Sequence, residues 1–240
     1  MPSVALVTGG AVRVGRAITL GLVDAGYDVV VNYHSSEGPA RELAALAGAQ
    51  GRKVHTVQGD VSDPGDVARI GEAVRSRFDR LDLLVHSASS FHATSLLDID
   101  SDEWDRVMEV NLKGSHLVVR ECANLLRVAR GVVVNIADHM GLEPWVHYAH
   151  HSVSKAALIH LTRIQAKALA PDVRVNAIAP GLVLAPEALS EEELASEIAS
   201  TALKTAGSPD DVVRTVLFLA SSPYITGQTI VVDGGRSLGR

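Results

Sequence analysis

The residues of this chain that are best suited to proton transfer lie between Asp138 and Lys155. His151 and Lys155 are four positions apart, so a helix would place their side chains on one face. An unperturbed imidazole titrates near neutral pH, and Lys155 would lower the pKa of His151 whereas Asp138 would raise it. Three interpretations are open: the imidazolium of His151 is a general acid, Asp138 donates the proton with or without a water, or the site is inactive and the protein only binds a ligand.

A glycine-rich turn at the start of the chain indicates a second kind of site, one for an anion. Apolar residues 4–7 are typical of a strand buried on both faces, and Gly9, Gly10 and Gly15 separate them from a helix that begins near Val14. Unpaired N–H groups at a helix N-terminus favour a phosphate, and glycine lets that phosphate approach the backbone closely. We expect a dinucleotide here, and the alternative is a glycine-rich turn that binds nothing.

Apolar runs and helical patterns alternate along the whole chain. Such alternation predicts a parallel sheet that is covered by helices on both faces, in a single α/β domain over residues 1–240. A long polar stretch over residues 182–206 has little core to join and is expected to be a lid over the substrate. The expected strands are 4–7, 28–33, 52–57, 81–86, 131–136, 173–178 and 229–232, and the expected helices begin at 14 and span 40–49, 64–78, 100–127, 147–169, 190–200 and 209–220.

Composition limits the possible classes of protein. The 240 residues are 47% hydrophobic and 21% charged, and this is ordinary for a globular protein. The net charge of −6 argues against a nucleic-acid-binding surface. The single cysteine, Cys122, excludes an internal disulfide and suits a reducing compartment. The first strand begins almost at Met1, which leaves no room for a signal peptide, and no apolar run could span a bilayer, so we expect a cytoplasmic protein without membrane contact.

Taken in order, the motifs of this chain resemble those of the short-chain dehydrogenase/reductase family over essentially its whole length. The opening turn resembles the family's TGxxxGxG phosphate loop, and the resemblance implies a Rossmann fold with a doubly wound sheet in the order 3-2-1-4-5-6-7. It also implies a homotetramer built through the two long helices and the last strand. The other matching segments are Gly59-Asp60-Val61, His86-Ser87-Ala88-Ser89 in place of NNAG, Val110-Asn111-Leu112, Pro180-Gly181 and the closing Thr226-Gly227 and Val232 to Gly235.

Within that family the chain is most similar to pteridine reductases and dihydromonapterin or dihydrofolate reductases. Four features carry this likeness: Arg13 in the phosphate loop, Tyr33 to Ser36 after the second strand, Ala88 to Phe91 after the fourth, and Asp138 where most members have a catalytic Ser. The family's catalytic Tyr stands four residues before the Lys, and this chain has His151 there instead. Tyr148 matches a tyrosine of the pterin pocket rather than the acid.

The resemblance implies a nicotinamide cofactor, and the end of the second strand selects NADPH. An acidic residue there would repel a 2′-phosphate, but the chain offers His34, Ser35 and Ser36 beside Asn32, with Arg13 near by. The plain alternative is a neutral loop with a solvated arginine. The residues expected to bind the cofactor are Gly9, Arg13, Val14, Gly15, His34, Ser35, Ser36, Asp60, Val61, Ser87, Ala88, Ser89, Lys155, Pro180, Gly181 and Val183.

The resulting functional prediction is an NADPH-dependent reductase of a pterin or a dihydrofolate-like substrate. One alternative is a carbonyl reductase of the 3-oxoacyl or sugar type, and another is a non-catalytic NADPH-binding protein, because the usual Tyr is absent. Histidines 139, 147, 150 and 151 also suggest a metal, but no cysteine or acidic cluster supports one, and we expect none. The expected catalytic residues are Asn111, Asp138, His151 and Lys155, and the expected substrate contacts are Arg13, Ser89, Phe91, Asp138, Trp145 and Tyr148.

Overall fold

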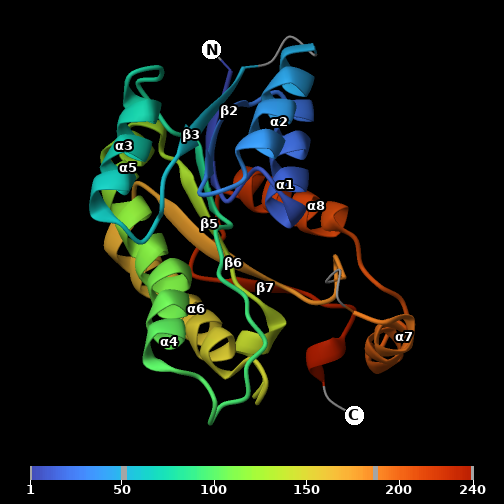
Figure 1. Cartoon of the computed structure of the whole chain (residues 1–240). Coiled ribbons are helices and arrows are strands. Elements are labelled where there is room, and N and C mark those ends of the chain that lie inside the picture. Colours follow the sequence, from blue (N-terminus) through green and yellow to red (C-terminus); the bar gives the residue numbers. More distant parts are fainter. Residues whose placement is uncertain (1, 50–52, 186–188, 239–240) are drawn as a thin grey trace.

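The computed structural model, which describes residues 2–49, 53–185 and 189–238, is built around a seven-stranded parallel sheet (Figure 1). The sheet order is β3-β2-β1-β4-β5-β6-β7, as expected for a doubly wound Rossmann fold. The fold prediction is therefore confirmed. The strands are β1 (Val4–Thr8), β2 (Asp28–Tyr33), β3 (Val54–Gln58), β4 (Leu83–His86), β5 (Val132–Ile136), β6 (Arg174–Pro180) and β7 (Thr229–Val232).

Helices cover both faces of this sheet, which is why its central strands are apolar without interruption. In β1, Ala5 and Val7 pack into one core while Val4 and Leu6 pack into the other, as the alternation of side chains along a strand requires. One face carries α1 (Arg13–Asp24), α2 (Glu37–Ala49) and α8 (Pro209–Ser221), and the other carries α3 (Pro64–Arg75), α5 (Gly114–Ala129) and α6 (Ala149–Leu169) (Figure 1).

The long helix expected over residues 100–127 is the main local error of the sequence prediction. It forms α4 (Ser101–Met108), a π-helical turn (Glu109–Lys113) and then α5. Asp100 caps α4 as expected, since its carboxylate accepts a hydrogen bond from the N–H of Glu103. A π turn shifts the helical register and is frequent at functional sites, and this one contains Asn111.

The described part of the segment predicted as a lid contains the helix α7 (Glu191–Ser200), which stands apart from the sheet (Figure 1). Its Ser190 and Glu193 form a reciprocal capping box. The segment is attached to the core at its end, because Leu203 donates a hydrogen bond to the carbonyl of Gly234. Residues 186–188 lie outside the described part of the chain, and closure over a substrate stays a prediction. Within the described ranges, no helix is long and apolar enough to cross a membrane.

Candidate active site

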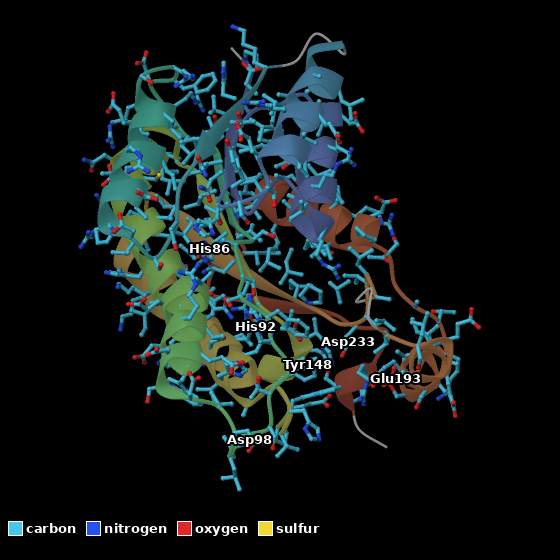
Figure 2. All side chains as sticks on the ribbon, viewed as in Figure 1. His86, His92, Asp98, Tyr148, Glu193 and Asp233 are labelled. Atoms are coloured by element: carbon cyan, nitrogen blue, oxygen red, sulfur yellow. The ribbon has the colours of Figure 1, made fainter. Side chains whose placement is uncertain are left out.

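The residues expected to be catalytic come from three different segments and meet at the carboxyl edge of the sheet, where open α/β sheets bind their ligands. Asp138 follows β5, His151 and Lys155 lie in the first turns of α6, and Asn111 lies in the π turn. Figure 2 shows Tyr148, just before α6, in the same lower part of the molecule as Asp233, which follows β7, and Glu193 of α7. The four residues predicted to be catalytic are thus brought together.

The carboxylate of Asp138 lies between two imidazole rings. Its Oδ2 is 3.5 Å from Nε2 of His151, and its Oδ1 is 3.0 Å from Nδ1 of His139. Oδ1 also accepts a hydrogen bond from the N–H of Met140 at the start of the short 3-10 helix His139–Gly141. Burial would raise the pKa of Asp138, but the hydrogen bonds and charges of the two histidines outweigh it and hold that pKa below its ordinary range. Asp138 is therefore a carboxylate at neutral pH.

His151 is almost completely enclosed. Its side chain is 3% exposed, whereas the side chain of Asp138 is 25% exposed. The ring of Phe91 stands against it edge to face, with the ring centres 4.8 Å apart. Its Nδ1 lies 3.3 Å from the carbonyl oxygen of Ser90. Burial lowers the pKa of His151 and Lys155 lowers it further, although Asp138 opposes both effects.

Each ring nitrogen of His151 faces a hydrogen-bond acceptor, and Nδ1 also lies 3.4 Å from the amide nitrogen of Asn111, whose two N–H groups go to Ser90 and Ser154. Nδ1 faces the carbonyl of Ser90 and Nε2 faces the carboxylate of Asp138. A neutral imidazole can donate to only one of them, while an imidazolium can donate to both. Within the described residues, Nε2 has no hydrogen-bond partner of good geometry. Because its pKa is lowered, His151 is mostly neutral at pH 7, and the carboxylate of Asp138 lies on the side of Nε2.

Lys155 is a buried ammonium held by the backbone of β5. Its Nζ donates a hydrogen bond of 2.9 Å to the carbonyl of Ile136. Burial lowers the pKa of Lys155 to about 8, against the opposing charge of Asp138. Its side chain thus stays cationic at neutral pH and lies close enough to influence both His151 and Asp138.

Asn111 fixes the backbone of the loop that follows β4. Its Oδ1 accepts a hydrogen bond of 2.7 Å from the N–H of Ser90, and its Nδ2 donates one of 3.1 Å to the carbonyl of the same residue. The second N–H of that amide goes to Oγ of Ser154, at 2.9 Å. Because the carbonyl of Ser90 also faces His151, Asn111 sets the position of the group that holds Nδ1.

The turn after β1 has a shape that fits a pyrophosphate. Gly9 has a φ of +60°, and a Cβ placed there would lie 2.8 Å from Cα of Ala88. A Cβ on Gly15 would lie 2.1 Å from the carbonyl oxygen of Gly9. No side chain caps the N-terminus of α1, whose first residues are Arg13 and Val14. This end of the helix is therefore able to receive an anion, as a dinucleotide would require.

The side chains expected around the 2′-phosphate divide into two groups. His34 and Ser35 are exposed after β2, and Ser36 is half-buried beside them. Asn32, in contrast, is buried and donates a hydrogen bond to the carbonyl of Gly59, so its role is to join two strand ends. The guanidinium of Arg13 donates to the carbonyls of Leu184 and Ala185, which belong to the segment predicted as a lid.

The remaining residues expected at the cofactor differ in what they contact. Asp60 binds Arg106 and Ser62 through its carboxylate, which holds its pKa at about 2 although burial opposes the shift. Val61 is buried in the core beneath Gly114. The other six follow β4 or lie at the end of β6. The N–H groups of Ser87 and Ala88 donate to Oγ1 of Thr8, and Ser89 is exposed. Pro180 ends β6, the N–H of Gly181 donates to the carbonyl of Val232, and Val183 is buried.

Three aromatic rings form a wall beside this group. Phe91 and Tyr148 are stacked, with ring centres 4.8 Å apart and planes inclined by 19°. Trp145 stands edge to face against His139, at 5.5 Å, and also contacts Tyr148. The guanidinium of Arg236 lies 5.3 Å from the ring centre of Trp145. The structure thus places all three aromatic residues expected at the substrate near the proton-transfer group.

Sequence reasoning did not single out several residues that complete this group. His139 was considered only as a metal ligand, and the parts played by Ser90, Ser154 and Arg236 could not be seen from their spacing. The histidines of the α6 segment do not converge, because His150 pairs with Glu103 while His151 faces Asp138. Among the residues that the structure describes, no three His, Cys, Asp or Glu side chains gather to hold a metal ion.

Known proteins resemble this chain over nearly its whole length. A family model described as enoyl-(acyl carrier protein) reductase matches residues 10–237. The 3-oxoacyl-[acyl-carrier-protein] reductase FabG of Staphylococcus aureus is 35% identical over 241 residues, with 98% of both chains covered. The 3-oxoacyl-[acyl-carrier-protein] reductase of Synechocystis is 36% identical over 239 residues, with 97% of this chain and 96% of the relative covered.

Solved structures give the same assignment. A short-chain type dehydrogenase/reductase from Mycobacterium ulcerans superimposes with a TM-score of 0.92 at 31% identity, covering 99% of this chain and 90% of that one. A short-chain dehydrogenase/reductase from Burkholderia xenovorans gives a TM-score of 0.92 at 30% identity, with 99% of both chains covered. The fold, the sequence matches and the placement of the site residues agree: this chain belongs to the short-chain dehydrogenase/reductase family of oxidoreductases.

Proposed function

We propose that this protein is an NADPH-dependent carbonyl reductase of small 3-oxo substrates, in which Asp138 and His151 replace the usual tyrosine as the source of the proton. The observation that carries the proposal is the approach of His151 Nε2 to Asp138 Oδ2, at 3.5 Å, beside the buried ammonium of Lys155. The names of the relatives support this alternative better than the pterin interpretation, because those curated proteins are 3-oxoacyl reductases.

The turn around Gly9 and Gly15 would hold the pyrophosphate of NADPH, and His34 and Ser35 would face its 2′-phosphate. When bound, the cofactor supplies a hydride. Lys155 would orient the cofactor and stabilise negative charge that develops on the substrate oxygen. The cation of Lys155 is retained at neutral pH, since its pKa of about 8 lies above 7.

The difference in exposure between Asp138 and His151 sets the route of the proton. His151 is enclosed, whereas a quarter of the side chain of Asp138 is exposed, 3.5 Å away from Nε2. In reduction, the proton held at Nε2 of His151 moves to Oδ2 of Asp138 and from there to the substrate oxygen, which becomes a hydroxyl. His151 is then neutral, and it takes up a new proton from solvent through Oδ2 of Asp138. This route combines two of the interpretations that the sequence leaves open.

The direction of the pH dependence follows from this route. Reduction needs the protonated form of His151, and the pKa of His151 is lowered below 6.5 by burial and by Lys155. The rate of reduction should therefore increase as the pH falls from 8 toward 6. In the reverse reaction His151 must accept a proton, so oxidation should be favoured at higher pH.

The test follows NADPH absorbance with an acetoacetyl thioester as the carbonyl probe, and measures NADPH and NADH binding separately by fluorescence. We expect turnover by the wild type, tighter binding of NADPH than of NADH, and a large loss of turnover in His151→Phe with cofactor binding retained. Equal turnover in His151→Phe would exclude the histidine as proton carrier. Binding without turnover, together with activity gained in His151→Tyr, would identify a non-catalytic NADPH-binding protein.

Reduction of a pterin is a second candidate, and the stacked pair of Phe91 and Tyr148 is the observation that favours it. Two aromatic rings beside a carboxylate suit a flat ring system whose N–H groups could donate hydrogen bonds to Asp138. Dihydrobiopterin and dihydrofolate are therefore tested in the same assay. Turnover of a pterin with Phe91→Ala raising its KM, and no turnover of the thioester, would assign the protein to pterin reduction instead.

A further inference from the structure

His139, which neither the proposed reaction nor its cofactor uses, occupies a site made by three separate segments. Its Nδ1 lies 3.0 Å from Oδ1 of Asp138 and 3.3 Å from the carbonyl oxygen of Pro180, the last residue of β6. On its other side the ring contacts Trp145 edge to face. The side chain is buried, so this position is fixed by packing as well as by hydrogen bonding.

These contacts determine which nitrogen of His139 carries a proton. Both atoms near Nδ1 are acceptors, a carboxylate oxygen and a carbonyl oxygen, so Nδ1 must be the donor. The N–H donates to the carbonyl of Pro180 and lies within 3.0 Å of Oδ1, while Oδ2 is the oxygen that faces His151. Oδ1 thus has the N–H of Met140 and the N–H of His139 beside it, and both contacts oppose a turn of the carboxylate.

Asp138 and His139 are neighbours in the chain, and their contact depends on the backbone conformation between them. Asp138 has extended backbone angles and is the residue that caps the 3-10 helix, while His139 is the first residue of that helix. In a continued strand, the two neighbouring side chains would point to opposite faces. Here the backbone changes from the extended form at Asp138 to the 3-10 helix at His139. This change brings the imidazole of His139 to the carboxylate of Asp138.

We propose that His139 is a positioning residue: its Nδ1–H holds Oδ1 of Asp138, so that Oδ2 stays turned toward His151 and remains the single oxygen through which the proton passes. This inference rests on the proposed reductase function, because it concerns the same carboxylate. It adds a second histidine to the site, on the side of Asp138 away from His151. His139 contacts Oδ1, the oxygen of Asp138 that does not carry the proton, and so acts through Asp138.

Charged groups that face His139 come from each segment packed around it. Asp138 and Glu143 lie in its own segment, Asp233 follows β7, and Arg236 lies beyond the ring of Trp145. Burial would lower the pKa of His139, but the hydrogen bond and charge of Asp138, the carbonyl of Pro180 and the charge of Glu143 together raise it. Most of the charged groups around the ring of His139 are therefore carboxylates, and this favours a proton on Nδ1.

The kinetic test compares His139→Ala with His139→Asn in the NADPH assay. The amide nitrogen of asparagine can take the place of Nδ1 and donate to Oδ1, whereas alanine cannot. We expect alanine to reduce kcat about tenfold or more with KM within about threefold of wild type, and asparagine to restore kcat to within about threefold. His147→Ala is the matched control, because His147 is exposed in the same segment, and it should change neither constant.

An NMR titration of the histidines gives a readout that does not depend on turnover. His139 should titrate above 6.5 in the wild type, and Asp138→Asn should lower its pKa, because the carboxylate that raises it is gone. An equal pKa in both proteins, or equal kcat losses in His139→Ala and His139→Asn, would overturn the inference. Absence of turnover with every probe would refute the proposed function, and the titration would still decide the contact of His139 with Asp138.

Discussion

Replacement of Asp138 by asparagine removes the charge that stabilises the protonated form of His151. Nε2 of His151 and Oδ2 of Asp138 are 3.5 Å apart. A unit charge at that distance is worth about 5 kcal/mol at an effective dielectric constant of about 20. Because a quarter of the Asp138 side chain is exposed, solvent screening reduces this interaction to about 2 kcal/mol. Its loss lowers the pKa of His151 and corresponds to about a 30-fold change in an equilibrium constant. The imidazolium form at pH 7 should become about 30-fold rarer.

The assay for this prediction is the initial rate of NADPH oxidation between pH 5 and pH 8, with an NMR titration of His151 in the same variants. We expect the rate of Asp138→Asn at pH 7 to fall at least about 30-fold. The variant loses the negative charge that stabilises protonated His151, and it loses the carboxylate oxygen that passes the proton to the substrate. The pKa of His151, already lowered by burial, should move further down.

Asp98→Asn is the matched control, since it makes the same change of charge at an exposed aspartate of the loop after β4. It should leave the rate, the pH dependence and the pKa of His151 unchanged. A rate for Asp138→Asn within about threefold of wild type, with the same pH dependence, would refute the reasoning. The same would follow from an unchanged pKa of His151, because the approach of the two side chains would then have no electrostatic consequence.

Other predictions concern the cofactor turn, the ion pair after β3, the buried thiol and the assembly. Gly15→Ala should weaken NADPH binding and lower the free energy of unfolding by about 1 to 3 kcal/mol, since its Cβ would meet the carbonyl of Gly9; fluorescence titration and urea unfolding measure both. Gly48→Ala, in open space on α2, is the control and should stabilise the fold by about 0.5 to 1 kcal/mol. Because the pKa of Asp60 falls from 3.8 to about 2 on folding, Asp60→Asn should cost about 2 kcal/mol at pH 7. That difference should disappear as the pH falls from about 4 to about 2; an equal cost at pH 2 would contradict it. Burial raises the pKa of Cys122 to about 12, so a thiol reagent should modify it only after unfolding, and rapid labelling of the native protein would be inconsistent with this burial. Light scattering checks the homotetramer, for which we expect four times the mass of one chain, and a monomer would exclude it.

Much of the fold could be read from the chain because its determinants are local. Buried strands such as residues 4–7 are continuous apolar runs, and helix starts such as Asp100 carry their own capping groups. The order of the strands came from a resemblance to a family, since no local pattern encodes which strands pair. The π turn around Asn111 is local, but the sequence does not predict it. A register shift of one residue leaves almost no trace in the spacing of apolar side chains.

For the site, the sequence by itself determined which groups are available: a lysine one turn after a histidine, an aspartate at a strand end, and a glycine turn that can admit a phosphate. The tertiary structure decided how they face one another. It placed the second imidazole, His139, on Asp138, turned Arg13 toward the segment after β6, and used Asn32 to join two strands. These outcomes depend on contacts between strand ends and loops far apart in the chain, and on the change of backbone conformation at Asp138, neither of which residue spacing can specify.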